Sequence, residues 1–590
     1  MVTDTSARAL FPIMPTLYFY PEISECPECR SKLNVQKSRP RTVVTMEIGA
    51  FHVKETVRVC PRDNMIFPSE LRSIVPKWCN IGFDVIVEVG MSLFIHCRNN
   101  QEVMTVLSAK NVFVSESQIS YLGQKFIIYL ALAHRESQAR LRKHMARRGG
   151  YILHVDGTCE GDSPNLFCGI DGLSELVLDT IKIPSEKKEY LVPFFRRIQD
   201  QYGSPKALVH DMGRGIISAV EEVFPGVADF VCHFHFLRDI GKDLLLDDYT
   251  ALHKRLKKLG VRSPLRQRAK YLESKINLCS QTLDEVVSSL EAGTWQTTSC
   301  EQVPLIMACA LIHWVFDYPQ DSNGYGFPFD RPHYDFFRRL QTAHRLLEEI
   351  MGVRLRDVVK DNKPFYQVYR VLKIAAKDNR LKNLASSLEK KSEVFDQLRS
   401  AMRIALPENK DGINDDGDNA DMKSIEGRVV AFRKSLTGDK RRKSMYSKML
   451  KQIDKYWEKL FADPLAVATP EGIVYIQPQR TNNILERFFR GEKRRSRKKN
   501  GMVSLNKVLR AALAETPLVQ NLHNAEYMDI VLNGCSTLAE RFSHIDACLV
   551  QEEMEKAKNN GERILPAIRK MSRTSDLTMK MHSLFLPDAK

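Results

Sequence analysis

Apolar runs and amphipathic segments alternate between residues 151 and 245 in an order that predicts a mixed α/β domain. Three short apolar runs come first, spaced like the strands of two successive hairpins: Ile152–Val155, Leu166–Ile170 and Leu176–Ile183. Short apolar runs bounded by Gly and polar residues are typical of buried strands. Residues 187–202 then carry apolar side chains at the spacing of one helix face.

A strand, a helix and a further strand complete this pattern. Ala207–His210 is a fourth apolar run, residues 216–224 are a second amphipathic segment, and residues 229–232 are a fifth run. The predicted fold is therefore a mixed five-stranded sheet with helices between its later strands. Asp156 follows the first run and Asp211 follows the fourth. Because these two strand ends can be neighbours in a mixed sheet, we expect the two carboxylates to meet there.

A third candidate carboxylate stands at the start of a basic helix, which is predicted over residues 481–499 with Thr481 as its N-cap. The apolar stripe of that helix is formed by Ile484, Leu485, Phe488 and Phe489. Glu486 lies beside this stripe. A lone Glu among so many cations is more often a surface ion-pair partner, but this position would let it project from a helix packed on the sheet.

Two aspartates and a glutamate in this arrangement predict a site for phosphodiester chemistry. Two divalent ions about 3.5–4 Å apart stabilise both the attacking and the leaving oxygen of an in-line displacement. Mg²⁺ (or Mn²⁺) prefers oxygen ligands, so carboxylates suit it better than imidazole or thiolate. We expect Asp156, on the most buried strand, to bridge both ions, and Asp211 and Glu486 each to complete the shell of one.

Other ionisable side chains of this region compete for a role. Asp162, Asp171 and Asp179 lie in the loop after the first strand or on the second and third strands. The second and third strands are farther from the fourth, so we rank these acids below the three chosen ones. Cys232 and His235 resemble zinc ligands, but no second pair lies nearby in the sequence, which favours a structural or active-site support role.

The N-terminal region carries a Cys-Pro-Glu-Cys segment that predicts a zinc knuckle. Cys26 and Cys29 have the spacing at which two thiolates can face one ion. Two alternating segments within residues 42–59 predict a β-hairpin, and they lead into Cys60-Pro-Arg-Asp63. Two such pairs on either side of a hairpin are typical of a zinc ribbon.

The second pair departs from this pattern, because Asp63 stands where a fourth Cys is expected. A carboxylate can bind zinc, although structural sites with one are less common than Cys₄ or Cys₃His sites. His52 or Cys79 would be substitute ligands. The alternatives for residues 1–97 are therefore a zinc-ribbon-like β module with one structural Zn²⁺ and a β module that has lost its metal.

Residues 98–150 begin with two helical patterns joined by a short turn. Ser115 and Gln118 form a capping box at the start of the second helix. This pattern favours a helix-turn-helix, whose second helix would place Gln118 in the major groove of DNA; an ordinary helical hairpin is the alternative. The basic residues that follow would contact phosphates or form a solvated face.

Residues 246–470 are rich in Leu, Lys, Arg and Glu with helical periodicity, and they lack the strand pattern. Within them, residues 407–422 have almost no apolar side chains and are predicted to be a mobile loop. Strand and helix signals resume in residues 471–515, which favours a large all-α insertion over an independent helical domain. Residues 151–245 and 471–515 would then form the two parts of one core, followed by a helical tail over residues 516–590.

The charge and composition of the chain indicate what kind of partner it binds. Of the 590 residues, 43% are hydrophobic and 27% are charged, which is ordinary for a globular chain of several domains. The net charge of +16 favours a polyanionic partner, nucleic acid before membrane, and no apolar run is long enough to span a bilayer. The 13 cysteines are scattered and odd in number, and the N-terminus lacks a signal-peptide pattern, so we expect a cytoplasmic, nucleoid-associated protein.

The basic helix is the clearest candidate for a DNA contact. Eight of the thirteen residues 487–499 are basic, and Glu492 is the only acid among them. With the candidate site next to it, we favour a track for the DNA backbone over a solvated basic face. The predicted DNA-binding residues are Gln118, Arg487, Arg490, Lys493, Arg494, Arg495, Arg497 and Lys498.

Four segments together resemble the motif blocks of DDE transposases from bacterial and archaeal insertion sequences: HVDGTCEG, VHDMGRGIISAVEEVFPG, CHFHFLRDIGKDL and RTNNILERFFRG. The Cys-x-x-His spacing and the helical segment before the Glu are similar to the branch that includes Mutator-like and hAT elements. This resemblance implies an RNase H-like catalytic core in which Asp156, Asp211 and Glu486 bind the metal ions. It also implies that Cys232 and His235 are an accessory pair, and that at least two copies assemble to hold two element ends.

The function expected from these features is DNA transposition: binding of element ends, metal-dependent cleavage, and strand transfer into target DNA. One alternative is a transposase-derived DNA-binding regulator without catalysis, and another is an RNase H-like nuclease that cuts without joining. All three carboxylates are present, which a regulator would not require. The zinc-ribbon and helix-turn-helix patterns favour recognition of element ends over the nuclease.

Overall fold

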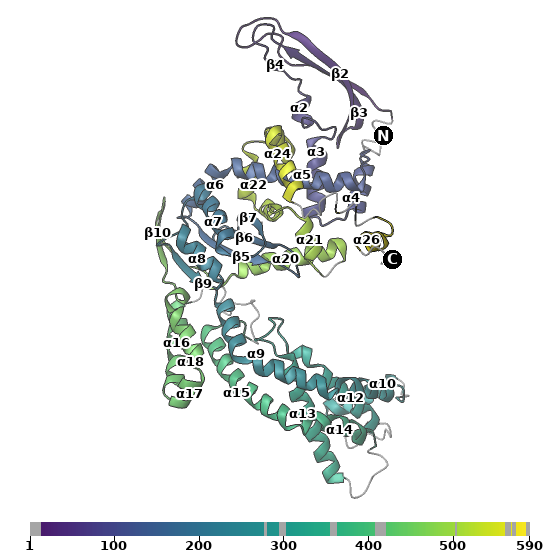
Figure 1. Ribbon diagram of the computed structural model, residues 1–590, viewed down its shortest axis with the longest axis vertical. Coiled ribbons are helices and arrows are strands. Elements are labelled where there is room, and N and C mark those ends of the chain that lie inside the picture. The colour runs from purple at the N-terminus through teal and green to yellow at the C-terminus, as the bar shows by residue number, and fades with distance from the viewer. Residues whose placement is uncertain are drawn as a thin grey trace. The chain divides into compact units, whose positions relative to one another are not determined.

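The chain divides into two compact units in the computed structural model. The first contains Met1–Phe230 and Pro464–Lys590, and the second contains Val231–Asp463. We call them the sheet unit and the helical unit and describe each by itself (Figure 1). The structure describes residues 13–276, 280–293, 303–354, 363–406, 421–501, 504–560, 568, 571 and 574–585. Most of the predicted mobile loop at 407–422 lies outside the described residues.

A five-stranded mixed sheet is the centre of the sheet unit, with the strand order β7-β6-β5-β8-β9. The strands are β5 (Ile152–Thr158), β6 (Asn165–Asp171), β7 (Val177–Ile183), β8 (Ala207–His210) and β9 (Ala228–Val231). β5 pairs antiparallel with β6 and parallel with β8, and β6 pairs antiparallel with β7. The helices between the later strands are α7 (Lys188–Tyr202) and α8 (Arg214–Val223), which lie next to each other in Figure 1. The predicted mixed sheet and its element order are confirmed.

Alternation along β5 gives the sheet two different faces. Leu153 and Val155 belong to the main core, together with the aromatic side chains of α7. Ile152 lies on the opposite face, in a smaller apolar cluster with Ala207 and Val209 of β8. The hairpin of β10 (Leu465–Thr469) and β11 (Gly472–Ile476) covers part of that second face. His154 and Asp156 share the parity of Ile152, so they point to the second face.

The C-terminal segment protects the edge strand β7. The side chain of Asn521 both accepts from the backbone N–H and donates to the carbonyl oxygen of Val177, each at 2.8 Å. The Thr180 hydroxyl donates to the carbonyl of Ala514 at 2.6 Å. An edge strand exposes backbone groups that would otherwise pair with another chain. The segment consists of α21 (Asn506–Ala511), η4 (Thr516–His523), α22 (Ala525–Leu532), α23 (Leu538–Ser543), α24 (Ala547–Asn560) and α26 (Leu577–Phe585), so the predicted helical tail is part of the sheet unit.

A long helix, α5 (Glu116–Glu136), runs through the core of the sheet unit. Its predicted capping box is present, with the Ser115 and Gln118 side chains each bonded to the other's backbone. From Lys125 to His134 every residue is buried, and the Tyr129 ring stacks on Phe542 at 5.1 Å. Exposed polar side chains of α5 therefore lie before Lys125 and again at Arg135 and Glu136, and the stretch between them is buried. The neighbouring helices are α2 (Leu71–Ile74), α3 (Phe83–Gly90), η1 (Met91–Ile95), α4 (Asn100–Ala109) and α6 (Gln138–Arg147).

The N-terminal module is a β structure built around a long hairpin. Its strands are β1 (Thr16–Phe19), β2 (Asn34–Thr45), β3 (Gly49–Val59) and β4 (Ile66–Phe67). The predicted hairpin is confirmed, and β2 begins earlier than its apolar pattern suggested, because residues 34–40 pair with β3 while being exposed. Val43, Phe51 and Val53 form the small core of the module.

The described elements of the helical unit are helices. They are α9 (His233–Leu259), α10 (Arg262–Glu273), α11 (Ser280–Glu291), α12 (Val303–Phe316), η3 (Tyr318–Asp321), α13 (Pro332–Arg354), α14 (Lys363–Ala376), α15 (Asn379–Met402), α16 (Met422–Thr437), α17 (Lys440–Met445), α18 (Ser447–Lys455) and α19 (Trp457–Leu460). α9 and α15 run side by side (Figure 1). This unit begins at residue 231 and not at the predicted 246, because α9 is one continuous helix of 27 residues. In the part of the chain that the structure describes, no helix has the length and apolarity needed to cross a membrane.

His134, near the end of α5, links three elements of the core. Its Nδ1 lies 3.0 Å from the Tyr527 hydroxyl, and its Nε2 lies 2.8 Å from the Tyr202 hydroxyl and 3.1 Å from the Leu178 carbonyl oxygen. Burial lowers the pKa of His134 from 6.5 to about 4. The neutral ring is therefore the form that the fold stabilises.

Stability of the sheet unit should fall as the pH is lowered from about 6.5 to about 4. In this window the unfolded chain protonates His134 and the folded one does not, so protonation favours unfolding by up to about 3 kcal/mol. The melting temperature measured against pH reports this effect. His134→Gln should make the dependence shallower, whereas His523→Gln, at an exposed histidine, should leave it unchanged.

Candidate active site and candidate metal centre

Strand register brings the first two candidate carboxylates to the same place on the sheet. In the parallel pair of β5 and β8, Leu153 is opposite Leu208 and His154 is opposite Val209. Continuing this register by two residues sets Asp156 opposite Asp211, which directly follows β8. Register partners on adjacent strands point to the same face, so both side chains project from the second face of the sheet.

Asp156 is buried among other acidic groups. The residue is 9% exposed, and its Oδ1 accepts a hydrogen bond from the Gly157 N–H at 2.8 Å. Burial raises the pKa of Asp156 well above its ordinary value, and the charges of Asp211, Glu486 and Glu186 raise it further. Glu486, 330 residues downstream, is thus within electrostatic reach of Asp156. We call Asp156, Asp211, Glu186 and Glu486 the carboxylate group. Four carboxyl groups whose charges act on one another favour the uptake of a cation or a proton.

The three candidate carboxylates, Asp156, Asp211 and Glu486, are not packed into one tight ligand group. Among the described residues, two groups have three or more ligand atoms within 4.8 Å of one another, Cys26/Cys29/Cys60/Asp63 and Glu273/Cys309/His313. Asp156, Asp211 and Glu486 do not form such a group. A two-ion site does not require it, because the outer carboxylates bind different ions that lie about 3.5–4 Å apart.

Asn482 fixes the helix that carries Glu486 to the strand that carries Asp156. Its buried side chain donates to the Val155 carbonyl and accepts from His154 Nδ1, both at 3.0 Å. Asn482, and not the predicted Thr481, is the N-cap of α20 (Asn483–Asn500). Glu486 follows one turn later and is half-buried. The two hydrogen bonds therefore anchor the start of α20 to the residues just before Asp156.

Glu186, in the loop before α7, is a fourth acidic group that the sequence did not reveal. It accepts from Asn165 Nδ2 at 2.6 Å, and burial followed by the Asp211 charge raises its pKa. A Cβ added at Gly157 would lie 2.5 Å from Glu186 Oε1, and one at Gly215 would lie 1.9 Å from its carbonyl oxygen. Gly157 and Gly215 thus make room for Glu186.

The lower-ranked aspartates have structural partners that account for their charge. These pairs are Asp171 with Ser174, Asp179 with Arg197, and Asp162 with Arg510. Each pair holds a loop or an edge of the sheet unit together.

Cys232 and His235 lie at the start of the helical unit. Cys232 is the buried N-cap of α9, and His235 is buried in the first turn. Burial, together with the charges of Arg238 and Lys242, lowers the pKa of His235 to about 3. Neither residue belongs to a metal-ligand group among the described side chains. Their role as an accessory pair stays a prediction.

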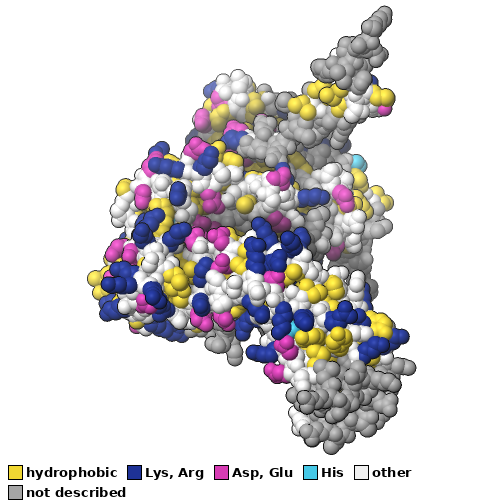
Figure 2. Space-filling view, turned by 60° about the horizontal axis from the view of Figure 1, so that its bottom comes forward, with side chains coloured by type: hydrophobic (Ala, Val, Ile, Leu, Met, Phe, Trp, Pro, Cys, Tyr) yellow, Lys and Arg dark blue, Asp and Glu magenta, His cyan; other side chains and the backbone are white. Residues whose placement is uncertain are grey.

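The outer face of α20 carries most of the predicted DNA-binding residues. The exposed ones are Arg487, Arg490, Lys493, Arg494, Arg497 and Lys498. Arg487 pairs with Glu175 at 2.9 Å, and the half-buried Arg495 pairs with Glu492 at 2.6 Å. Gln118 is exposed, but its side-chain oxygen accepts from the Ser115 N–H in the capping box. Lys and Arg side chains gather in several groups on the face shown in Figure 2, with acidic side chains between them.

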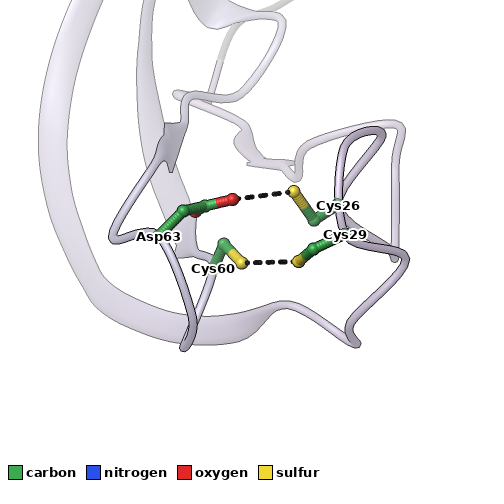
Figure 3. A group of neighbouring side chains, drawn as sticks. All are labelled: Cys26, Cys29, Cys60 and Asp63. Atoms are coloured by element: carbon green, nitrogen blue, oxygen red, sulfur yellow. Dashed lines mark hydrogen bonds between the residues drawn. The ribbon is translucent and has the colours of Figure 1, made fainter.

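Three cysteines and an aspartate of the N-terminal module form a compact group (Figure 3). Cys26 Sγ lies 3.3 Å from Asp63 Oδ2, and Cys29 Sγ lies 3.3 Å from Cys60 Sγ. Hydrogen bonds from Ser31 lower the pKa of Cys29 to about 7, while burial raises that of Cys60 to about 11. The predicted ligands are therefore together, with Asp63 and neither His52 nor Cys79 in the fourth position.

This group fits a zinc ion in both chemistry and size. Zn–S bonds of about 2.3 Å separate neighbouring sulfurs of a tetrahedral site by roughly 3.8 Å, close to the spacing observed. We expect Cys60→Ser to lower the zinc content of the full chain by about one ion and to lower the melting temperature of the module. Asp63→Cys should slow the loss of zinc to a chelator. Cys79→Ser should change neither quantity, and zinc loss in that variant would move the fourth ligand away from Asp63.

No protein-family model matches the chain, and a search of the curated proteins finds no match either.

Proposed function

We propose that the chain is a DNA transposase of the DDE type, with an RNase H-like core that an all-α segment interrupts. The observation that supports this most is the strand register, which when continued by two residues sets Asp156 opposite Asp211, together with the effect of the Glu486 charge on Asp156. Three antiparallel strands, a helix and a parallel fourth strand are the order expected of such a core. The return of the chain from the helical unit to the sheet unit at residue 464 agrees with an interrupted core.

The donor set fits magnesium or manganese. Asp156 would hold both ions, and Asp211 and Glu486 would each complete the shell of one. Such ions, when bound, supply positive charge at the attacking and leaving oxygens of a phosphodiester. Asn482 contributes by holding the start of the Glu486 helix against β5, the strand that carries Asp156.

The same helix that provides Glu486 would guide the DNA backbone. Arg490, Arg494 and Lys498 are exposed and recur every four residues, so they line one face of α20 leading away from the site. Side chains at this spacing neutralise successive phosphates. The cysteine module and the exposed first turns of α5 are the proposed contacts to element ends, and the proposed assembly has at least two copies.

A cleavage and strand-transfer assay tests this proposal. The full chain is incubated with labelled DNA that flanks its gene, with Mg²⁺ or Mn²⁺, and with a supercoiled target plasmid. A transposase releases 3′-hydroxyl ends and joins them to the plasmid. Cleavage without joining would identify the nuclease, and binding without either reaction would identify the regulator.

A further inference from the structure

The helical unit contains a second group of metal-ligating side chains, and it shares no residue with the groups described above. Cys309 and His313 are four residues apart on α12, so they lie on the same side of that helix. Glu273 is the last residue of α10, which packs against α12. Their ligand atoms all lie within 4.8 Å of one another, and His313 Nε2 is 2.7 Å from Glu273 Oε1.

The three residues of this group differ in how far they are buried. Cys309 is only 5% exposed, whereas the side chains of His313 and Glu273 are 59% and 49% exposed. The Cys309 thiol makes a long contact of 3.9 Å with the Ala269 carbonyl oxygen. The thiol thus forms the floor of an open site, and the imidazole and carboxylate form its rim. If Glu273 and His313 formed only a surface ion pair, a buried thiol next to them would have no role in it.

We propose that Glu273, Cys309 and His313 form a binding site for a zinc-like divalent ion. A thiolate, an imidazole and a carboxylate together favour a borderline-soft cation over Mg²⁺ or Ca²⁺. Three protein ligands leave the fourth tetrahedral position for water or another ligand on the solvent side. The ion would tie the end of α10 to the middle of α12. This site is independent of the proposed function, because it shares no residue with the carboxylate group.

Cobalt substitution can test this site in the full chain. A thiolate bound to Co²⁺ gives a charge-transfer absorption band that carboxylate ligands do not give. Cobalt bound at Asp156 therefore does not contribute to this band. The background is a Cys26→Ser, Cys60→Ser variant, which removes two sulfurs of the N-terminal group. We expect this background to bind one thiolate-ligated Co²⁺ and to exchange it for Zn²⁺.

Removing single ligands from that background identifies the site. Cys309→Ser should abolish the band, and His313→Gln or Glu273→Gln should weaken cobalt binding at least tenfold while keeping the helical circular dichroism. The last two changes are at half-exposed side chains, so they test the site even if Cys309→Ser does not fold. Cys548→Ser, at an exposed cysteine, is the matched control and should have no effect. A background without the band, or a band that persists in Cys309→Ser, would overturn the proposal.

Discussion

Asp156→Asn is expected to lower the rates of DNA cleavage and strand transfer at least about 10³-fold. The amide keeps the shape of the side chain but removes the negative charge that would bridge two cations. Binding to element ends should persist, because it depends on other surfaces. Gel-based cleavage and joining assays, with binding measured in parallel, give all three quantities for the same protein preparation.

The same substitution should not destabilise the fold. Burial and neighbouring charges raise the pKa of Asp156, so its ionised form opposes folding at neutral pH. Asn removes that cost, and the melting temperature should stay the same or rise. Asp200→Asn, at an exposed residue of α7, is the control for charge and should keep full activity. Cleavage by Asp156→Asn above a tenth of the normal rate would show that the carboxylate assignment is wrong.

Neutralising the basic face of α20 is expected to weaken DNA binding roughly 10²-fold at 0.15 M salt. Each phosphate contact contributes about 0.9 to the slope of log affinity against log salt concentration, so Arg490→Ala, Arg494→Ala and Lys498→Ala together should lower its magnitude by about 2.7. Fluorescence anisotropy over a series of salt concentrations measures the affinity and the slope together.

A matched triple variant distinguishes the effect of this face on DNA affinity from the effect of net charge. Lys254, Lys257 and Lys258 are exposed on α9 and provide the same loss of three charges. Their replacement by Ala should leave the slope close to that of the unaltered chain. An equal loss in both variants would mean that DNA is attracted by the overall charge of +16 and not by α20.

Local pattern was sufficient to predict the sheet. The apolar runs at residues 152–155 and 207–210 became β5 and β8. Asp211 follows β8 directly, as expected, whereas Asp156 lies within β5, which continues to Thr158. Their register was not predictable, because it depends on side chains that meet only in the folded unit. Glu186 was missed for a related reason: it lies in a polar loop without periodicity, and only its surroundings show that it faces the aspartates.

Two interpretations show where one-dimensional patterns mislead. The segment Phe126–Ala133 is apolar on every side, which is typical of a buried helix. The capping box at the start of the same helix nevertheless suggested an exposed helix that enters the major groove of DNA. The burial of α5 follows from the first signal. In the sequence, Asn482 is one polar residue among several. Its hydrogen bond to His154 could not be inferred, because the two residues are 328 positions apart in the chain.

The division of the sheet unit between two distant stretches of chain affects how the protein is made. After Asp156 has left the ribosome, 330 more residues must be synthesised before Glu486 follows. At about 5–20 residues per second this takes between roughly 15 and 65 s. During that interval the second face of the sheet lacks α20 and the edge of β7 lacks the segment that caps it. The consequence is that the carboxylate group is completed only near the end of translation.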